Sequence, residues 1–124
     1  MKIYAPKEKV KMAKTTIQVN SVKKVVNMTV AGRMTMSDAE LFIKEYQVKI
    51  GPLNGPDFEL EVDATDMQVL TPEMTENLTE VMKMYKKTGF KKVTVIITQT
   101  PVLKMQLSRI ARNAGLTQFV LAVK

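Results

Sequence analysis

The chain has 124 residues, with 19 lysines and arginines against 12 aspartates and glutamates, and it contains no histidine, cysteine or tryptophan. This composition excludes disulfides, zinc sites built from Cys and His, and Ser-His or Cys-His nucleophile pairs. No apolar run approaches the roughly 18 residues that a membrane-spanning helix needs, and the N-terminus lacks the apolar segment of a signal peptide. We therefore expect one domain in a soluble, cytoplasmic protein.

Positive charge is concentrated in residues 1–14, which we interpret as a basic N-terminal arm ahead of a domain at residues 15–124. The arm has five lysines and one glutamate, so it contributes +4 to a net charge of +7. An arm of this kind is attracted to nucleic acid, to an anionic membrane or to an acidic protein surface. The alternative is a solvated terminus without a partner. The candidate contact residues in the arm are Lys7, Lys9, Lys11 and Lys14.

Hydrophobic periodicity predicts the first elements after the arm. Residues 16–20 and 25–31 are predicted to be two strands of a hairpin, with the turn near Ser21 and Lys23. A first helix is predicted to begin at the N-cap Ser37, with Glu40 as its capping-box partner, and to end at Gly51-Pro52. Residues 58–63 alternate between apolar and acidic side chains, which is typical of a strand.

Two Thr-Pro pairs predict the starts of the remaining helices. At the first pair, Thr71 is the expected N-cap, Pro72 the first helical residue and Glu73 the acid that favours a helix start. This helix is expected to end at Thr88-Gly89, and the helix that opens at Thr100-Pro101 is expected to end at Gly115. Strands are predicted at 91–98 and 118–123, so the element order is β-β-α-β-α-β-α-β.

The predicted strands alternate between apolar and polar positions. A sheet covered by helices on both sides has continuously apolar strands, so the alternation favours three helices on one face only. The predicted fold is α/β, with an N-terminal β-hairpin followed by superhelical βα turns and about five strands. The apolar set is Ile17, Val19, Val26, Met28, Val30, Phe58, Leu60, Val62, Val93, Val95 and Ile97, and the polar set is Gln18, Asn20, Asn27, Thr29, Glu59, Glu61, Asp63, Thr94 and Thr98.

Three segments carry a resemblance to the STAS domain, the fold of bacterial anti-sigma-factor antagonists and of the cytoplasmic tails of sulfate transporters. Residues 30–40 resemble the Gly-containing turn into the first helix of that family. Residues 58–71 resemble its central strand and the following loop, and residues 99–116 resemble its third helix, which begins after a Pro and ends in Gly-Leu. The resemblance covers residues 16–123 and implies the fold predicted above and a role in protein interaction.

The start of the second helix departs from the family pattern. Phosphorylated STAS antagonists have an Asp-Ser-Ser/Thr-Gly run there, whereas this chain has Pro72 in place of the phosphorylatable Ser. A phosphoryl dianion would change partner binding by charge and desolvation, so the departure indicates that this switch is absent. STAS domains also usually have a further helix after the last strand, and we expect the surface beneath it to be covered by the arm or by a partner. The resemblance implies a contact surface at Thr71, Pro72, Glu73, Met74 and Thr75.

Other constellations of residues give weaker indications. The acidic residues of and around the 58–63 strand have the oxygen ligands that Ca²⁺ and Mg²⁺ prefer, but alternate carboxylates on one strand are usually its solvated face. No nucleophile, oxyanion device or Gly-rich phosphate loop accompanies them, so we expect neither an enzyme nor a cofactor. Loop methionines are candidates for an adaptable contact surface, and the cations of the third helix are interpreted as its polar face. The acidic residues are Asp57, Glu59, Glu61, Asp63 and Asp66. The loop methionines are Met34, Met36 and Met67, and the cations of the third helix are Lys104, Arg109 and Arg112.

The leading functional hypothesis is a non-enzymatic, regulatory STAS-like module that binds another protein and is not switched by phosphorylation. The alternative is a structural subunit of a larger assembly, such as a phage virion or a stressosome-like particle, in which the arm contacts other copies. A third hypothesis is nucleic-acid binding by the arm, although the body has no arginine-rich helix and no aromatic RNP-type strand. We also expect the arm to be held weakly by the acidic row Glu59, Glu61 and Asp63.

Overall fold

The computed structural model describes residues 15–30, 36–67 and 69–124 of the chain. The helices and strands alternate much as the sequence predicts, with boundaries that differ by a residue or two. In chain order the elements are β1 (Thr15–Asn20), β2 (Val25–Val30), α2 (Met36–Ile50), the short 3₁₀ helix η1 (Gly55–Asp57), β3 (Glu59–Asp63), α3 (Pro72–Thr88), β4 (Lys92–Ile97), α4 (Pro101–Ala114) and β5 (Phe119–Val123).

The five strands form one mixed sheet whose spatial order is the chain order, β1-β2-β3-β4-β5. β1 and β2 pair antiparallel, and every later pair is parallel. The hairpin turn is organised by the side chain of Asn20, whose Oδ1 accepts from the backbone N–H groups of Val22 at 3.1 Å and Lys23 at 3.0 Å. Parallel neighbours need a crossover, and α2, α3 and α4 supply the three that this sheet requires.

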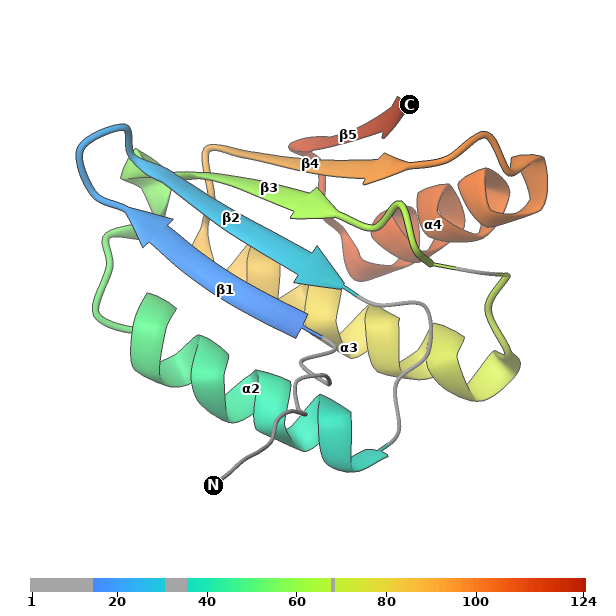
Figure 1. Cartoon of the computed structure of the whole chain (residues 1–124), viewed down its shortest axis with the longest axis horizontal. Coiled ribbons are helices and arrows are strands. Elements are labelled where there is room, and N and C mark those ends of the chain that lie inside the picture. Colours follow the sequence, from blue (N-terminus) through green and yellow to red (C-terminus); the bar gives the residue numbers. More distant parts are fainter. Residues whose placement is uncertain (1–14, 31–35, 68) are drawn as a thin grey trace, which may run out of the picture.

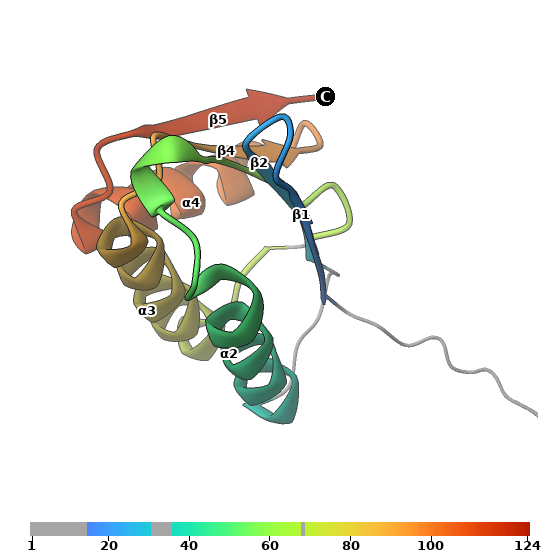
Figure 2. The same cartoon turned by 90° about the vertical axis from the view of Figure 1, so that its left-hand side faces the viewer.

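Helices α2, α3 and α4 lie on the same side of the sheet (Figure 1). The view along the sheet shows α2 beside β1, and α4 beside β4 and β5, while the opposite face of the sheet has no helix in the described part of the chain (Figure 2). Strand burial alternates in the same sense, because Leu60 and Val62 of β3 are buried whereas Glu59 and Glu61 are exposed. The predicted α/β fold, with a hairpin leading into βα turns and helices on one face, is confirmed.

The core lies between the sheet and the helix layer. A row of aromatic rings crosses it from Phe42 and Tyr46 of α2 through Tyr85 of α3 to Phe90. The hydroxyl of Tyr46 lies 2.6 Å from Oγ1 of Thr88, and that of Tyr85 donates to Sδ of Met28 at 3.4 Å. Burial raises the pKa of Tyr46 to about 12, and it also raises the pKa of Tyr85. Both phenols are therefore neutral components of the core.

The helix ends agree with the sequence except at the start of α2. Gly89 and Gly115 follow α3 and α4 with left-handed φ values of 82° and 76°, which only glycine adopts readily. Helix α2 begins at Met36, so Ser37 lies inside its first turn and the prediction that Ser37 is the N-cap is wrong. Serine also fits the first turn of a helix, and the pattern alone did not fix the boundary to one residue.

Candidate protein-interaction site

The loop from Ala64 to Leu70 connects the carboxyl end of β3 to the start of α3. Its first residue continues the sheet, because the N–H of Ala64 donates to the carbonyl of Ile96 at 2.8 Å. A turn follows in which the N–H of Met67 donates to the carbonyl of Ala64 at 3.0 Å. Ala64, Met67 and Leu70 are buried, while the side chain of Val69 is 51% exposed. The loop is thus pinned to the core and presents an apolar side chain to solvent.

Gln106 of α4 fixes the end of this loop. Its Oε1 accepts from the N–H of Leu70 at 2.9 Å, and its Nε2 donates to the carbonyl of Leu70 at 3.0 Å. One side-chain amide therefore satisfies both backbone groups of a residue that the loop could not pair within itself. The pair joins α4 to the residue directly before Thr71.

The start of α3 is capped as the sequence predicts. Thr71 has extended backbone angles, and its Oγ1 accepts from the N–H of Met74 at 3.2 Å. Its carbonyl accepts from the N–H of Thr75 at 2.9 Å and from the hydroxyl of Thr75 at 3.0 Å. Pro72 occupies the first helical position, where the N–H that it lacks would have no helical acceptor.

The five residues predicted for the contact surface divide into two groups. Thr71, Pro72 and Glu73 are exposed, so they are available to a partner. Met74 and Thr75 are half-buried, and Met74 packs against the hydrophobic core. That these residues form a contact surface remains a prediction. The accessible part of the surface consists of Thr71–Glu73 and the neighbouring Val69.

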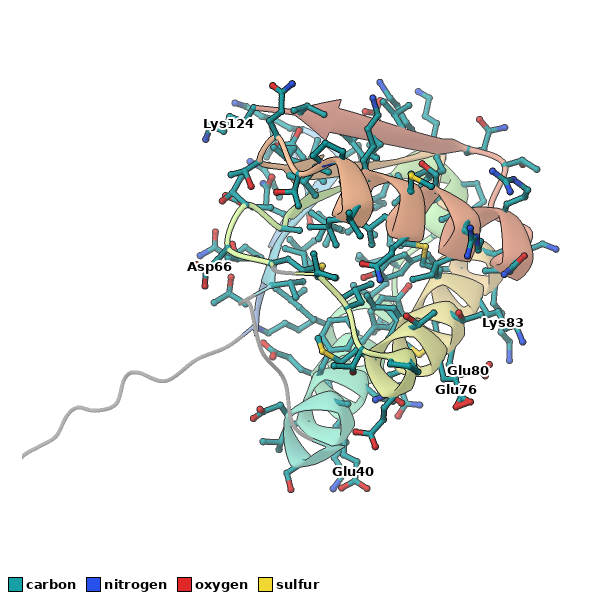
Figure 3. All side chains as sticks on the ribbon, turned by 90° about the vertical axis from the view of Figure 1, so that its right-hand side faces the viewer. Glu40, Asp66, Glu76, Glu80, Lys83 and Lys124 are labelled. Atoms are coloured by element: carbon teal, nitrogen blue, oxygen red, sulfur yellow. The ribbon has the colours of Figure 1, made fainter. Side chains whose placement is uncertain are left out.

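Carboxylates dominate the solvent side of α3 near this start. Glu73, Glu76 and Glu80 are exposed, and Glu80 pairs with Lys83 at 3.2 Å. Figure 3 shows Glu76, Glu80 and Lys83 together on the outer side of α3. Negative charge in the first turn interacts favourably with the N-terminal end of the helix dipole. The surface thus places exposed carboxylates beside the exposed side chains of Val69 and Pro72.

Asp63 supports the loop from the end of β3. Its Oδ1 accepts from the hydroxyl of Thr65 at 2.7 Å and from the N–H of Thr65 at 3.0 Å. These hydrogen bonds, together with the positive charge of Lys124, lower the pKa of Asp63 below its usual value. The labelled side chains of Asp66 and Lys124 lie at the same end of the sheet in Figure 3.

The acidic row predicted to receive the arm lies on the sheet face away from the helices. Glu59 and Glu61 are exposed there, and Asp63 is half-buried. Glu59 is opposite Lys92 of β4 in the parallel register. Among the described residues, no group of three or more acidic, His or Cys side chains could hold a metal ion. The arm residues Lys7, Lys9, Lys11 and Lys14, and also Met34, lie outside the described residues.

Sequence analysis missed Gln106 and Leu70 as parts of this site. Gln106 lies on the flank of the apolar stripe of α4, next to the buried Leu103 and Leu107. A long polar side chain on such a flank is an indication that it reaches a neighbouring segment. Its partner could not be identified from the sequence, since Leu70 is 36 positions away.

Comparisons with models of known protein families, with curated proteins and with solved structures find no match to this chain. Within the described residues, none of the helices has the length and apolar character needed to span a membrane.

Proposed function

We propose that this chain is a non-enzymatic, STAS-like protein-interaction module whose contact surface is the start of α3. The support from the fold is the hairpin followed by three βα crossovers with helices on one face, which is the arrangement that the resemblance implies. The support from the site is a surface of exposed residues, Thr71 to Glu73 and Val69, at the end of a pinned loop.

The observation that carries the proposal is the pairing of Gln106 with both backbone groups of Leu70. Association costs free energy when loops and side chains must become ordered at the interface. Because Gln106 and the Thr71 cap already order this segment, that cost is lowered before a partner arrives. A loop held in place by the half-buried Gln106, with Val69 and Thr71 to Glu73 exposed, is well suited to recognition.

The proposed module is regulatory without a phosphoserine switch. Pro72 has no hydroxyl, and the hydroxyl oxygen of Thr71 is engaged with Met74 N–H. Incubation with an anti-sigma-type Ser kinase and ATP should therefore leave the intact mass unchanged. Stoichiometric phosphate on Thr71 or Thr75 would show that the switch exists.

Site-specific photo-crosslinking tests the contact surface. A photoreactive amino acid at Glu73 should give one discrete crosslinked protein in cells that naturally make this chain. The matched control is the same amino acid at Glu40, an exposed glutamate on α2 that lies away from the loop (Figure 3). Gln106→Ala should weaken the crosslink from position 73. Equal crosslinking from positions 73 and 40 would contradict the proposal.

Light scattering separates the module from the structural-subunit alternative. The module is expected to be monomeric at micromolar concentration. A large homo-oligomer, with crosslinks from position 73 only to other copies of the chain, would favour the structural subunit.

A further inference from the structure

Strand β5 forms one edge of the sheet and has a free outer side in the described part of the chain. The N–H of Val93 donates to the carbonyl of Gln118 at 2.7 Å, and the N–H of Lys124 donates to the carbonyl of Ile97 at 2.8 Å. In a parallel ladder, this pattern turns the backbone groups of even-numbered β5 residues toward β4. The N–H and C=O groups of Phe119, Leu121 and Val123 therefore point away from the sheet.

In the described part of the chain, β5 lacks the proline and the charged side chains that usually protect an edge strand from pairing. Residues 119–123 are all apolar and include neither proline nor a charged residue. Val120 and Val123 remain 43% and 42% exposed. The opposite edge differs, because the ammonium group of Lys49 donates to the carbonyl of Ile17 in β1 at 3.0 Å. Lys49 belongs to α2, and a charged group held at an edge strand discourages a further strand from pairing there.

Helix α4 adds a basic surface beside the edge. It has three cations, Lys104, Arg109 and Arg112, and no acidic residue. These three side chains line a shallow depression of about 450 Å³ together with Pro101, Met105 and Ser108. Gln106, which reaches Leu70 in the loop before α3, does not line the depression, and the residues that line it are exposed or half-buried. Figures 2 and 3 show α4 running beneath β5, the edge strand of the sheet.

We propose that β5 and the basic side of α4 bind an extended, acidic polypeptide segment of a partner, which adds to the sheet as a sixth strand. Only a polypeptide backbone offers alternating donors and acceptors at the spacing of Phe119, Leu121 and Val123. Carboxylates on the helix side of the added strand would lie near Lys104 and Arg112. This surface is separate from the start of α3, and the inference does not depend on the function proposed above.

Charge disfavours a second copy of the chain as the occupant. A twofold pairing of β5 with itself would align its apolar residues well, with Leu121 opposite Leu121. It would also bring the basic sides of two α4 helices toward each other, and like charges in an interface oppose association. An acidic strand has the same backbone pairing without this repulsion.

Fluorescence anisotropy with synthetic peptides tests the proposal on the full chain. The probe is a labelled peptide of alternating Glu and Val, and two control peptides alternate Lys with Val or Glu with Pro. The Glu-Val peptide should bind, and added salt should weaken binding. The Lys-Val peptide should not bind. The Glu-Pro peptide has the same charge, but its prolines fix φ at about −65° and remove half of its backbone donors, which disfavours strand pairing. Equal binding of it would mean simple charge attraction and would overturn the proposal.

Charge reversal on α4 tests the position of the site. Lys104→Glu combined with Arg112→Glu should weaken binding of the Glu-Val peptide by about tenfold or more and allow the Lys-Val peptide to bind. The control is Lys44→Glu combined with Lys87→Glu, which makes the same change in net charge at exposed positions on α2 and α3. Similar losses in both double variants would contradict the assignment to α4.

Amide hydrogen exchange tests the pairing itself without any substitution. The Glu-Val peptide should slow exchange at Phe119, Leu121 and Val123, whereas Val120 and Ala122 should already exchange slowly in the free chain. Binding without this alternating pattern would overturn strand addition. Slow exchange at all five residues in the free chain, together with a dimer in light scattering, would show that a second copy occupies the edge.

Discussion

Two helices of this protein begin with the same dipeptide, Thr-Pro, and the two starts are built differently. At α3, Thr71 has φ −79° and ψ 162°, and its hydroxyl oxygen caps the N–H of Met74. At α4, Thr100 has φ −129° and ψ 98° and makes no side-chain cap. Its hydroxyl instead lies 3.4 Å from that of Thr98. The same sequence motif therefore begins both helices while the stabilising contacts differ.

The depth of burial explains why the two starts differ. Leu103, the third residue of α4, is fully buried, so the core holds that helix almost from its beginning. The first buried side chain of α3 is Met82, which comes three turns after Pro72. Before Met82, Met74 and Leu78 pack against the core while only partly buried. The first turns of α3 therefore depend more than those of α4 on polar contacts, above all on Gln106 and Thr71. An exposed helix start held by a few hydrogen bonds is available for binding but is also the more vulnerable of the two.

Among substitutions that test this difference between the two helix starts, Gln106→Ala is expected to lower the unfolding free energy most. It leaves both backbone groups of Leu70 without their partner in a half-buried place, which should cost about 2 kcal/mol of unfolding free energy. Urea denaturation measures the loss, and Asn113→Ala, at an exposed position of the same helix, is the control. Hydrogen exchange should quicken in the first turns of α3 and not in α4. An unchanged stability would mean that the loop is held by its buried apolar residues alone.

The next effect is expected from Thr71→Ala. Loss of the cap to Met74 N–H should cost about 1 kcal/mol, measured by the same urea titration. Thr71→Ser keeps the hydroxyl and should restore most of the stability. If alanine and serine at this position behave alike, the cap does not stabilise α3 and its effective start lies elsewhere.

The elements with strong local patterns could be predicted from the sequence. The alternation in β3, with Leu60 and Val62 inside and Glu59 and Glu61 outside, indicated helices on one face, which the structure confirms. Thr71 as N-cap and Gly89 as helix stop are confirmed as well. These features depend on neighbours within a few residues, and the sequence displays such neighbours directly.

The contacts between distant segments could not be predicted in this way. Gln106 and Leu70 meet only because α4 packs beside α3, and no local pattern identifies that pair. The lack of a side-chain cap at Thr100, where φ is −129° and ψ is 98°, could not be predicted either, because its sequence matches that of Thr71. The first turn of α2 shows that the exact start of a helix is also hard to predict from sequence, since Ser37 fits both inside a helix and before it.

A pH-dependent effect is expected at Asp63, because the loop before α3 has an ionisable support. The hydrogen bonds from Thr65 lower the pKa of Asp63 in the folded state below its unfolded value of 3.8. The stabilisation is thus fully present above the unfolded pKa, and it is lost as the pH falls through the folded pKa. Asp63→Asn should be less stable than wild type at pH 7, by less than Thr71→Ala, and the gap should narrow as the pH falls below the unfolded pKa of 3.8. A gap that does not change with pH would mean that the carboxylate charge has no role.

The smallest effect is expected from Thr100→Ala, and it tests the comparison most directly. A threonine at an N-cap is usually worth about 1 kcal/mol because its oxygen satisfies a free N–H. Thr100 makes no such bond, and Leu103 holds the helix from within the core, so the loss should stay below about 0.5 kcal/mol in urea denaturation. The matched measurement is Thr71→Ala in the same buffer, since both variants remove the same atoms before a Pro. Equal losses at the two positions would show that Thr-Pro stabilises a helix start through the local chain alone, whereas unequal losses show that the cap bond is what distinguishes α3.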